Sequence, residues 1–328
     1  MILAGDVGGT KTVLGLFSRA EAGGRPIRQA RFDSRDHDSL EAIVAEFLKD
    51  TGSIPAVASF GIAGPVLGRR AKVTNLPWEI DADAIAAAFG IPSVHLLNDL
   101  QAIATVVPHL SADALCALSA GRPDPTGTKA VIAPGTGLGI SFLTWTGTRY
   151  QAHPTEGGHA SFAPATPEQV ELLAFLARRF GHVSCERVCS GSGIPNLYDF
   201  LRAAGSYDEP DWLRQALAEA DDPTPVIVTA GLERRAEIAV AVLDMFVRIL
   251  GGVVGNVALK VLATGGLYLG GGIPPRILAR LRQPDFLQAI THKGRFSTLL
   301  SNIPVSVILD PESALHGAAF DALHCVEG

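Results

Sequence analysis

The sequence has few of the features that mark secreted, membrane-bound or nucleic-acid-binding proteins. It contains only 4 cysteines in 328 residues, and its formal net charge is −6. Sparse cysteines in a chain without a secretion signal predict free thiols in a reducing compartment. The negative charge argues against a nucleic-acid or anionic-membrane surface, although it is compatible with a local basic groove. We therefore expect a soluble, cytoplasmic protein.

No uncharged apolar run is long enough for a signal peptide or a membrane span. Asp6 interrupts the N-terminal run after five residues, and the most apolar long segment, 238–262, contains Asp244, Arg248 and Lys260. This segment predicts a buried helix together with the residues that follow it, and not a membrane span. With 47% hydrophobic residues and this length, the chain predicts a globular protein with two lobes.

Two standard nucleotide-binding fingerprints are absent. A Walker loop requires glycine directly before Lys-Thr, but Thr10 precedes Lys11. A dinucleotide fingerprint that starts at Gly135 requires glycine at position 140, where the chain has Ile140. Repeats of fixed period are also missing, which excludes solenoids and propellers.

A glycine-rich turn, 5–12 (GDVGGTKT), lies between two apolar segments at the N-terminus and predicts a β-hairpin. Gly8 and Gly9 let the amides of the turn approach an anion closely. Asp6 is suited to hold a Mg²⁺ ion that bridges phosphate oxygens, and Thr10 offers a hydroxyl donor. From this stretch alone, an ordinary hairpin with a polar tip is the alternative.

Two further glycine clusters follow along the chain. Residues 135–139 (GTGLG) repeat the hairpin layout without the acidic residue, and residues 270–272 are three glycines after a short apolar strand. Together the three turns predict a cradle for β/γ-phosphate, α/β-phosphate and adenosine, respectively. The repeated layout also predicts two related α/β halves that face each other across a cleft.

The order of apolar segments predicts an α/β fold with a mixed sheet, because strands and helices alternate through the first third of the chain. The first helix is predicted to begin at a capping box formed by Asp38 and Glu41. The polar stretch 205–225 is predicted to be an exposed excursion around one helix. Helices are predicted in the second half at 168–180, 195–204, 212–220 and 233–250.

Asp99 is the predicted general base. It follows an apolar strand at 94–97 and begins a helix, and α/β sheets bind ligands at the carboxyl ends of their strands. The helix N-terminus favours the ionised carboxylate. Because a loose phosphoryl-transfer transition state needs positioning more than strong basicity, this carboxylate can accept a hydroxyl proton. From the residue alone, a plain N-cap is the favoured alternative.

Glu156, His159 and Glu186 are candidate sugar ligands, because carboxylates and an imidazole can bind sugar hydroxyls. Surface charges in a turn are the alternative, and for Glu186 alone that alternative is the better one.

A zinc site near His182 is not predicted. His182, Cys185 and Cys189 supply three ligands, whereas structural zinc sites require four. The two cysteines instead predict core thiols at helical spacing. Residues 293–295 (KGR) either contact phosphate or form a solvated basic turn.

In combination, these motifs resemble those of the bacterial ATP-dependent glucokinases of the hexokinase–actin fold, nearly from end to end. Residues 5–10 resemble the family's first phosphate motif, 135–139 its second, and 270–273 its adenosine-side turn, with 293–296 at the expected distance behind it. Further stretches similar to the family are 61–66, 74–76 and 182–187.

The resemblance implies the two-domain ribonuclease H-like, actin-like ATPase fold of hexokinases, with mixed sheets around an interdomain cleft. It implies a small domain at 1–109, completed by a C-terminal helix at about 311–328, and a large domain at 110–310. The implied reaction transfers the γ-phosphoryl group of ATP, with Mg²⁺, to the 6-hydroxyl of glucose. The usual assembly of the family is a homodimer.

The resemblance also implies residue roles. Asn98 and Asp99 would contact the sugar, with Asp99 taking the 6-hydroxyl proton, and Glu156, His159 and Glu186 would hold the remaining hydroxyls. Asp6 is the predicted Mg²⁺ ligand. The predicted nucleotide-binding residues are Asp6, Gly8, Gly9, Thr10, Lys11, Gly135, Thr136, Gly137, Gly271 and Gly272.

Lys11 departs from the family, because these glucokinases often carry Asn there and Asp-x-Gly-Gly-Thr-Lys is typical of a sister group of sugar kinases and repressors. That group has a cysteine-rich zinc motif, which residues 182–186 lack. The zinc-free glucokinase branch is therefore favoured, and Lys11 is left as either a phosphate contact or a solvated side chain.

Three alternatives to a glucokinase are a kinase for fructose, mannose or an N-acetylated sugar, a non-catalytic sugar sensor or repressor, and an actin-like ATPase scaffold. Repressors of this type carry a DNA-binding segment before the first phosphate motif, and only five residues precede Asp6. A scaffold would have no use for the set around Glu156.

Overall fold

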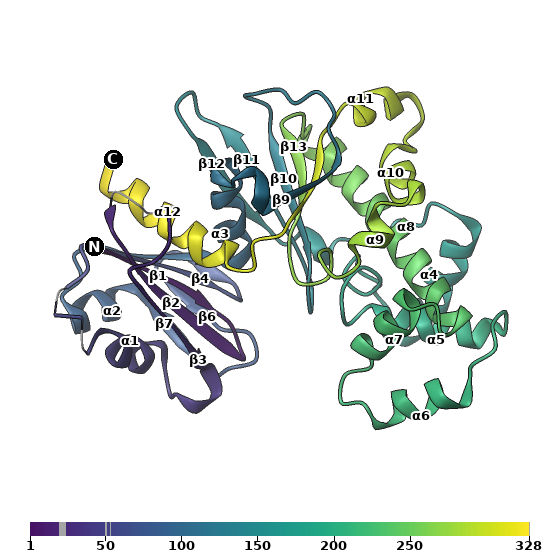
Figure 1. Cartoon of the computed structure of the whole chain (residues 1–328), viewed down its shortest axis with the longest axis horizontal. Helices are drawn as coiled ribbons and strands as arrows, with labels where there is room; N and C mark the ends of the chain where they lie inside the picture. The colour runs from purple at the N-terminus through teal and green to yellow at the C-terminus, as the bar shows by residue number, and fades with distance from the viewer. Residues whose placement is uncertain (20–23, 50, 53, 328) are drawn as a thin grey trace. The chain divides into compact units, whose positions relative to one another are not determined.

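The computed structural model describes residues 1–19, 24–49, 51–52 and 54–327, and the chain divides into two compact units (Figure 1). Residues 141–154 and the C-terminal helix group with the N-terminal residues. Unit 1 comprises Met1–Ala114, Ser141–Pro154 and Asp310–Gly328, and unit 2 comprises Leu115–Ile140 and Thr155–Leu309.

Unit 1 is built on a five-stranded sheet in the order β3-β2-β1-β4-β8. The first three strands are antiparallel neighbours, whereas β4 and β8 run parallel to β1. The N-terminal hairpin is therefore confirmed, with Asp6 opposite Val13. The strands are β1 (Ile2–Val7), β2 (Lys11–Phe17), β3 (Arg28–Asp33), β4 (Val57–Ile62) and β8 (Val94–Asn98).

Helices cover both faces of this sheet, so its central strands are apolar on both sides. Successive residues of β1 point to opposite faces, and Leu3 packs with α1 and α2 while Ile2 and Ala4 pack with α12. The helix α3 packs against α12 and β4. The helices are α1 (Leu40–Leu48), α2 (Ala82–Phe89), α3 (Asp99–Val106) and α12 (Ser313–Glu327).

The predicted capping box at α1 is wrong by one residue. Ser39 is the N-cap, and its hydroxyl accepts a hydrogen bond from the Ala42 amide at 3.3 Å. The buried stripe of α1 begins at Leu40, so the helix must begin there and the cap falls on the residue before it. Unit 1 also contains a three-stranded sheet that was not predicted. Its strands are β5 (Val66–Leu67), β6 (Arg70–Lys72) and β7 (Glu79–Asp81).

Unit 2 contains most of a six-stranded sheet in the order β12-β11-β10-β13-β14-β9. Its first five strands repeat the order of unit 1, with a hairpin on one side of the first strand and two parallel strands on the other. This duplication confirms the prediction of two related halves. The strands are β9 (Leu115–Ser119), β10 (Lys129–Pro134), β11 (Leu138–Trp145), β12 (Tyr150–Thr155), β13 (Gly266–Leu269) and β14 (Val305–Ile308).

The helices of unit 2 include several that were not predicted. α7 begins at Pro223 inside the predicted excursion, because Asp222 caps it by accepting from the Thr224 amide at 2.9 Å and proline suits the first helical turn. The helices are α4 (Pro167–Phe180), α5 (Ile194–Ala204), α6 (Asp211–Glu219), α7 (Pro223–Leu232), α8 (Glu237–Val261), α9 (Leu278–Leu281), α10 (Pro284–Thr291) and α11 (Ser297–Ser301).

α8 is one helix of 25 residues, longer than the predicted 233–250. Its glycines do not end it but allow α10 to approach closely: a Cβ at Gly251 would lie 2.6 Å from the Phe286 carbonyl oxygen. By length and composition α8 could cross a membrane, yet 72% of its most apolar window is buried in the structure, as expected for a core helix. All four cysteines are free, as predicted.

Candidate active site

Asn98 and Asp99 lie where β8 ends and α3 begins. The Oδ1 atom of Asn98 accepts from the Leu100 amide at 3.0 Å, which makes Asn98 the N-cap. The N-cap interpretation of Asp99 is therefore wrong, because Asp99 is the first residue of the helix. Its carboxylate accepts from the same Leu100 amide at 2.8 Å and is only partly buried. The helix N-terminus stabilises negative charge at this position.

The side chain of Asn98 is held at both ends. Its Nδ2 atom donates to the Gly64 carbonyl oxygen at 3.2 Å, while its Oδ1 atom caps α3. Gly64 has φ 157°, and a Cβ there would lie 2.1 Å from the Lys72 carbonyl oxygen. Gly64 thus positions Asn98, a role that the sequence signalled only through the family-like stretch 61–66.

The first glycine turn is held by backbone and hydroxyl contacts. The Gly8 amide donates to the Lys11 carbonyl oxygen at 2.9 Å, and the Ser34 hydroxyl donates to the Gly8 carbonyl oxygen at 2.8 Å. A Cβ at Gly9 would lie 2.6 Å from the Thr74 carbonyl oxygen, so this position requires glycine on packing grounds. Thr10 is exposed at the tip of the turn. The support from Ser34 was not predicted, because no motif marks that residue.

Asp6 is a mostly buried carboxylate that lies beside the ammonium group of Lys11. Its side chain is 22% exposed, and its Oδ2 atom lies 4.0 Å from Lys11 Nζ. Burial raises the pKa of Asp6, and the positive charge of Lys11 opposes this rise. A second cation near Asp6 would offset the unfavourable free energy of burying its charge. The Asp6 carboxylate therefore suits the role of a Mg²⁺ ligand.

Asp6 and Asp99 approach the same edge of the unit 1 sheet. Gly61 pairs with Asp6 across β1 and β4, and a Cβ at Gly61 would lie 3.9 Å from the Asp99 Cα atom. Because β1, β4 and β8 are parallel, their carboxyl ends lie together, and this edge is where α/β sheets bind ligands. Unit 1 therefore brings together the predicted metal ligand, the phosphate turn and the predicted base.

Glu186 joins two predicted site segments within unit 2. Its Oε2 atom accepts from the Leu138 amide at 2.9 Å, at the second glycine turn. Its own amide donates to the Gly158 carbonyl oxygen at 3.0 Å. A Cβ at Gly137 would lie 2.5 Å from Glu186 Oε2. The interpretation of Glu186 as a plain surface charge is therefore wrong.

Glu156 precedes a short 3₁₀ turn, Gly157–His159, and His159 is its last residue. Their side chains face one another, with Glu156 Oε2 3.9 Å from His159 Nε2, and are 76% and 62% exposed, respectively. Both are therefore accessible to a ligand. The turn packs on the second hairpin without room for a side chain, since a Cβ at Gly158 would lie 1.9 Å from the Leu138 carbonyl oxygen.

The second and third glycine turns are neighbours. The Gly270 amide donates to the Ile132 carbonyl oxygen at 3.0 Å, and Gly271, with φ 80°, approaches the end of β10. A Cβ at Gly271 would lie 2.6 Å from the Pro134 carbonyl oxygen, whereas Gly272 faces open space. Because Pro134 directly precedes the second turn, unit 2 places the predicted α/β-phosphate and adenosine turns together.

The structure changes the predictions for the cysteine pair and for the basic residues 293–295. Cys189 is buried as predicted, but Cys185 is partly exposed, and both lie in successive tight turns instead of a helix. Lys293 does not extend into solvent: its Nζ atom donates to Asn256 Oδ1 at 2.8 Å and to the Gly252 carbonyl oxygen at 3.3 Å. Burial lowers the pKa of Lys293.

A family model described as glucokinase matches residues 3–324. The chain belongs to the glucokinase family. The glucokinase of Nostoc punctiforme is 41% identical over 98% of both chains. The crystal structure of a glucokinase from an Antarctic psychrotroph has a TM-score of 0.86 and 30% identity, over 98% of both chains.

A more distant structure shows the shared fold. The glucokinase of the ROK family from Streptomyces griseus, solved in complex with glucose and AMPPNP, has a TM-score of 0.62 and 20% identity, over 98% of this chain and 99% of that chain. The actin-like ATPase fold predicted from the sequence is confirmed. As a member of the glucokinase family, the chain is an ATP-dependent hexose kinase.

Proposed function

We propose that the chain transfers the γ-phosphoryl group of ATP to the 6-hydroxyl of glucose, giving glucose 6-phosphate and ADP, with Asp99 as the general base. The observation that carries this proposal is the junction of β8 and α3, where a helix N-terminus and a capped Asn98 hold the Asp99 carboxylate at the ligand-binding edge of the sheet. The relative at 41% identity supports glucose as the acceptor.

Asn98 and Asp99 have separate tasks in this mechanism. The Asp99 carboxylate accepts the proton of the 6-hydroxyl as the oxygen attacks the γ-phosphorus. Asn98 orients the sugar, because its amide retains one donor and one acceptor beyond the contacts with Gly64 and Leu100. A fixed amide loses little side-chain entropy when it binds a hydroxyl.

The remaining sugar hydroxyls are assigned to unit 2. Glu156 and His159 are exposed and adjacent, and Glu186 is fixed by the Leu138 amide. A carboxylate held in this way can accept from sugar hydroxyls without reorganising.

The nucleotide is assigned to the three glycine turns. Gly8, Gly9, Thr10 and Lys11 bind the terminal phosphates, Gly135, Thr136 and Gly137 the α/β-phosphates, and Gly271 and Gly272 the adenosine. Asp6 would hold Mg²⁺, which when bound neutralises charge on the phosphate oxygens. Lys11 adds a second positive charge beside Asp6.

We also propose the remaining features of the family for this chain. These are a small domain at 1–109 completed by 311–328, a large domain at 110–310, a homodimeric assembly and a cytoplasmic location.

A coupled assay with ATP and Mg²⁺ over glucose, mannose, fructose and N-acetylglucosamine tests the proposed reaction. We expect kcat/KM for glucose to exceed that for each other hexose by at least about tenfold, because a site that bonds a hydroxyl rejects an epimer that misplaces it. The same panel is run with ADP and polyphosphate as donors. A higher kcat/KM for another hexose, or turnover with polyphosphate but not with ATP, would contradict the proposal.

A further inference from the structure

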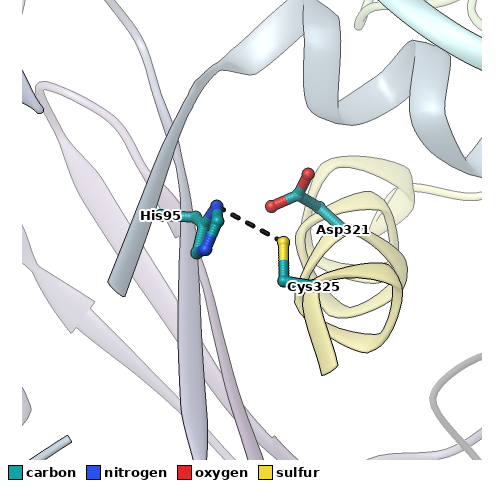
Figure 2. A group of neighbouring side chains, drawn as sticks. All are labelled: His95, Asp321 and Cys325. Atoms are coloured by element: carbon teal, nitrogen blue, oxygen red, sulfur yellow. Dashed lines mark hydrogen bonds between the residues drawn. The ribbon is translucent and has the colours of Figure 1, made fainter. Parts of the chain in front are cut away.

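Three metal-ligating side chains of unit 1 meet beside β8, outside the proposed active site (Figure 2). His95 lies on β8, and Asp321 and Cys325 lie one turn apart on α12, so the two project from the same side of that helix. One ligand atom from each residue lies within 4.8 Å of the other two. None of the three side chains is fully buried, so an ion can reach them from solvent.

We propose that His95, Asp321 and Cys325 bind one divalent transition-metal ion of the Zn²⁺ class. Thiolate, imidazole and carboxylate are the ligands that such ions take in proteins. Tetrahedral bonds of about 2.3 Å to sulfur and 2.0 Å to nitrogen place those two atoms roughly 3.5 Å apart. Cys325 Sγ and His95 Nδ1 are already 3.4 Å apart. The Asp321 carboxylate moves inward to complete three ligands, and the fourth position stays open.

Hydrogen bonds orient two of the three ligands. Ser93 Oγ lies 2.9 Å from His95 Nε2, so the Nε2–H group can donate to the hydroxyl while Nδ1 faces Cys325. The Ser59 hydroxyl donates to Asp321 Oδ2 at 2.8 Å. Partners of this kind accompany metal-bound histidines and carboxylates, because they fix the ring tautomer and the direction of the lone pair.

The charges of the cluster match a divalent cation. Asp321 and a deprotonated Cys325 together carry two negative charges, and neutral His95 adds none. Arg149 and His324 also face Asp321, but burial outweighs them and raises the pKa of Asp321. Partial burial and the Asp321 charge raise the pKa of Cys325 to about 11, so metal binding must release the thiol proton to solvent.

The bound ion would join the C-terminal helix to the strand that leads to the proposed base. His95 lies three residues before Asn98 on β8, whereas the other two ligands lie near the end of α12. Because these elements meet only in the folded unit, the ion binds the native state more tightly than the unfolded chain and raises the thermal midpoint of the protein.

Metal titration of the EDTA-treated full chain tests this site. The wild type is expected to bind one Co²⁺ ion with a thiolate-to-cobalt charge-transfer band, to release about one proton and to lose the band when Zn²⁺ is added. Cys325→Ser and His95→Gln should abolish the band and weaken Zn²⁺ binding at least about tenfold. Cys116→Ser, which removes a thiol of unit 2, should leave both unchanged.

Ser59→Ala leaves all three ligands in place and removes only the hydrogen bond to Asp321, so it should weaken binding about ten- to a hundredfold. Phosphorylation of glucose by each variant, measured without Zn²⁺, reports whether it is folded. The site would be refuted by a Co²⁺ spectrum of folded Cys325→Ser equal to that of the wild type. Wild-type binding only at millimolar metal, without a charge-transfer band, would refute it equally.

Discussion

At the scale of single residues, Asp6 and Lys11 form the pair on which the phosphate end of the site depends. Both belong to the first hairpin, with Asp6 at the end of β1 and Lys11 at the start of β2. Burial disfavours the charge of Asp6, and Lys11 at 4.0 Å is the cation that offsets this effect. The pair therefore links the proposed Mg²⁺ ligand to the proposed phosphate contact.

Lys11→Met should raise the KM for ATP about tenfold, which corresponds to about 1.4 kcal/mol of binding free energy. The reason is that the variant removes a positive charge from the terminal phosphates and from Asp6. Steady-state kinetics at saturating glucose measure this effect, and Lys49→Met, at an exposed lysine after α1, serves as the control. An unchanged KM would show that Lys11 is a solvated side chain.

We expect the pair of His316 and Asp310 to make a pH-dependent contribution to the stability of unit 1. His316 Nδ1 donates a hydrogen bond to Asp310 Oδ2 at 2.8 Å, and this bond raises the pKa of His316 despite burial. Burial opposes ionisation of Asp310, but the contacts with His316 and the Glu312 amide outweigh it and lower the pKa of Asp310. The His316 contribution is complete below its unfolded pKa near 6.5 and is lost as pH rises through the raised folded value.

The Asp310 contribution is present above its unfolded pKa near 3.8 and is lost as pH falls through the lowered folded value. Asp310→Asn should therefore destabilise the protein by about 1–2 kcal/mol between pH 4 and pH 6.5, and by less at pH 9. Urea unfolding at pH 6 and pH 9 measures the difference. An equal loss at both values would show that charge at His316 does not contribute.

At the scale of elements, the contact between α12 and α3 fixes the helix that carries Asp99. Gly317 on α12 allows this approach, because a Cβ there would lie 1.8 Å from the Ala102 carbonyl oxygen. The displaced atom would be backbone, which cannot rotate away as a side chain can. A helix at the end of the chain thus determines the position of the proposed base.

Gly317→Ala should destabilise the protein by about 1–3 kcal/mol and lower kcat, because α3 must move to relieve the overlap. Gly252→Ala in α8 is the matched control, since a Cβ there meets nothing within 4 Å. That variant should be neutral or stabilising, by up to about 1 kcal/mol. Thermal unfolding and kinetics on both variants measure these effects. Equal stability of the two variants would contradict the proposed contact.

Much of the order of helices and strands could be predicted, because the local spacing of apolar, polar and glycine residues indicates hairpins and amphipathic helices. Gly8, Gly9 and the apolar segments around them gave the first hairpin, but no local pattern marks the short sheet of β5, β6 and β7. The predicted helix ended at residue 250, before the true end of α8, because glycine disfavours a helix. The close packing of α10 against these glycines is visible only in the structure. The cluster of His95, Asp321 and Cys325 escaped prediction because its members lie far apart in the sequence.

The site shows the same division between local and long-range information. Asp99 and the glycine turns could be predicted from short motifs. The contact of Glu186 with Leu138 could not, because it joins a turn to a strand 48 residues earlier. The support of Asn98 by Gly64 likewise depends on the pairing of β4 with β8.

At the scale of the whole molecule, the chain contains two sheets that share the same order of five strands, and it divides into two compact units. Unit 1 carries the proposed metal ligand, the first glycine turn and the proposed base, and unit 2 carries the proposed sugar ligands and the other two glycine turns.

The turnover of Asp99→Asn with glucose and ATP tests most directly whether Asp99 is the general base. Asparagine retains the shape of the side chain but cannot accept the hydroxyl proton, so kcat should fall about 10²- to 10⁴-fold while glucose binding, measured by calorimetry, stays within a few-fold. Asp83→Asn, in the first turn of α2, is the control and should keep wild-type kcat. A near wild-type kcat for Asp99→Asn would contradict the assignment of Asp99 as the general base.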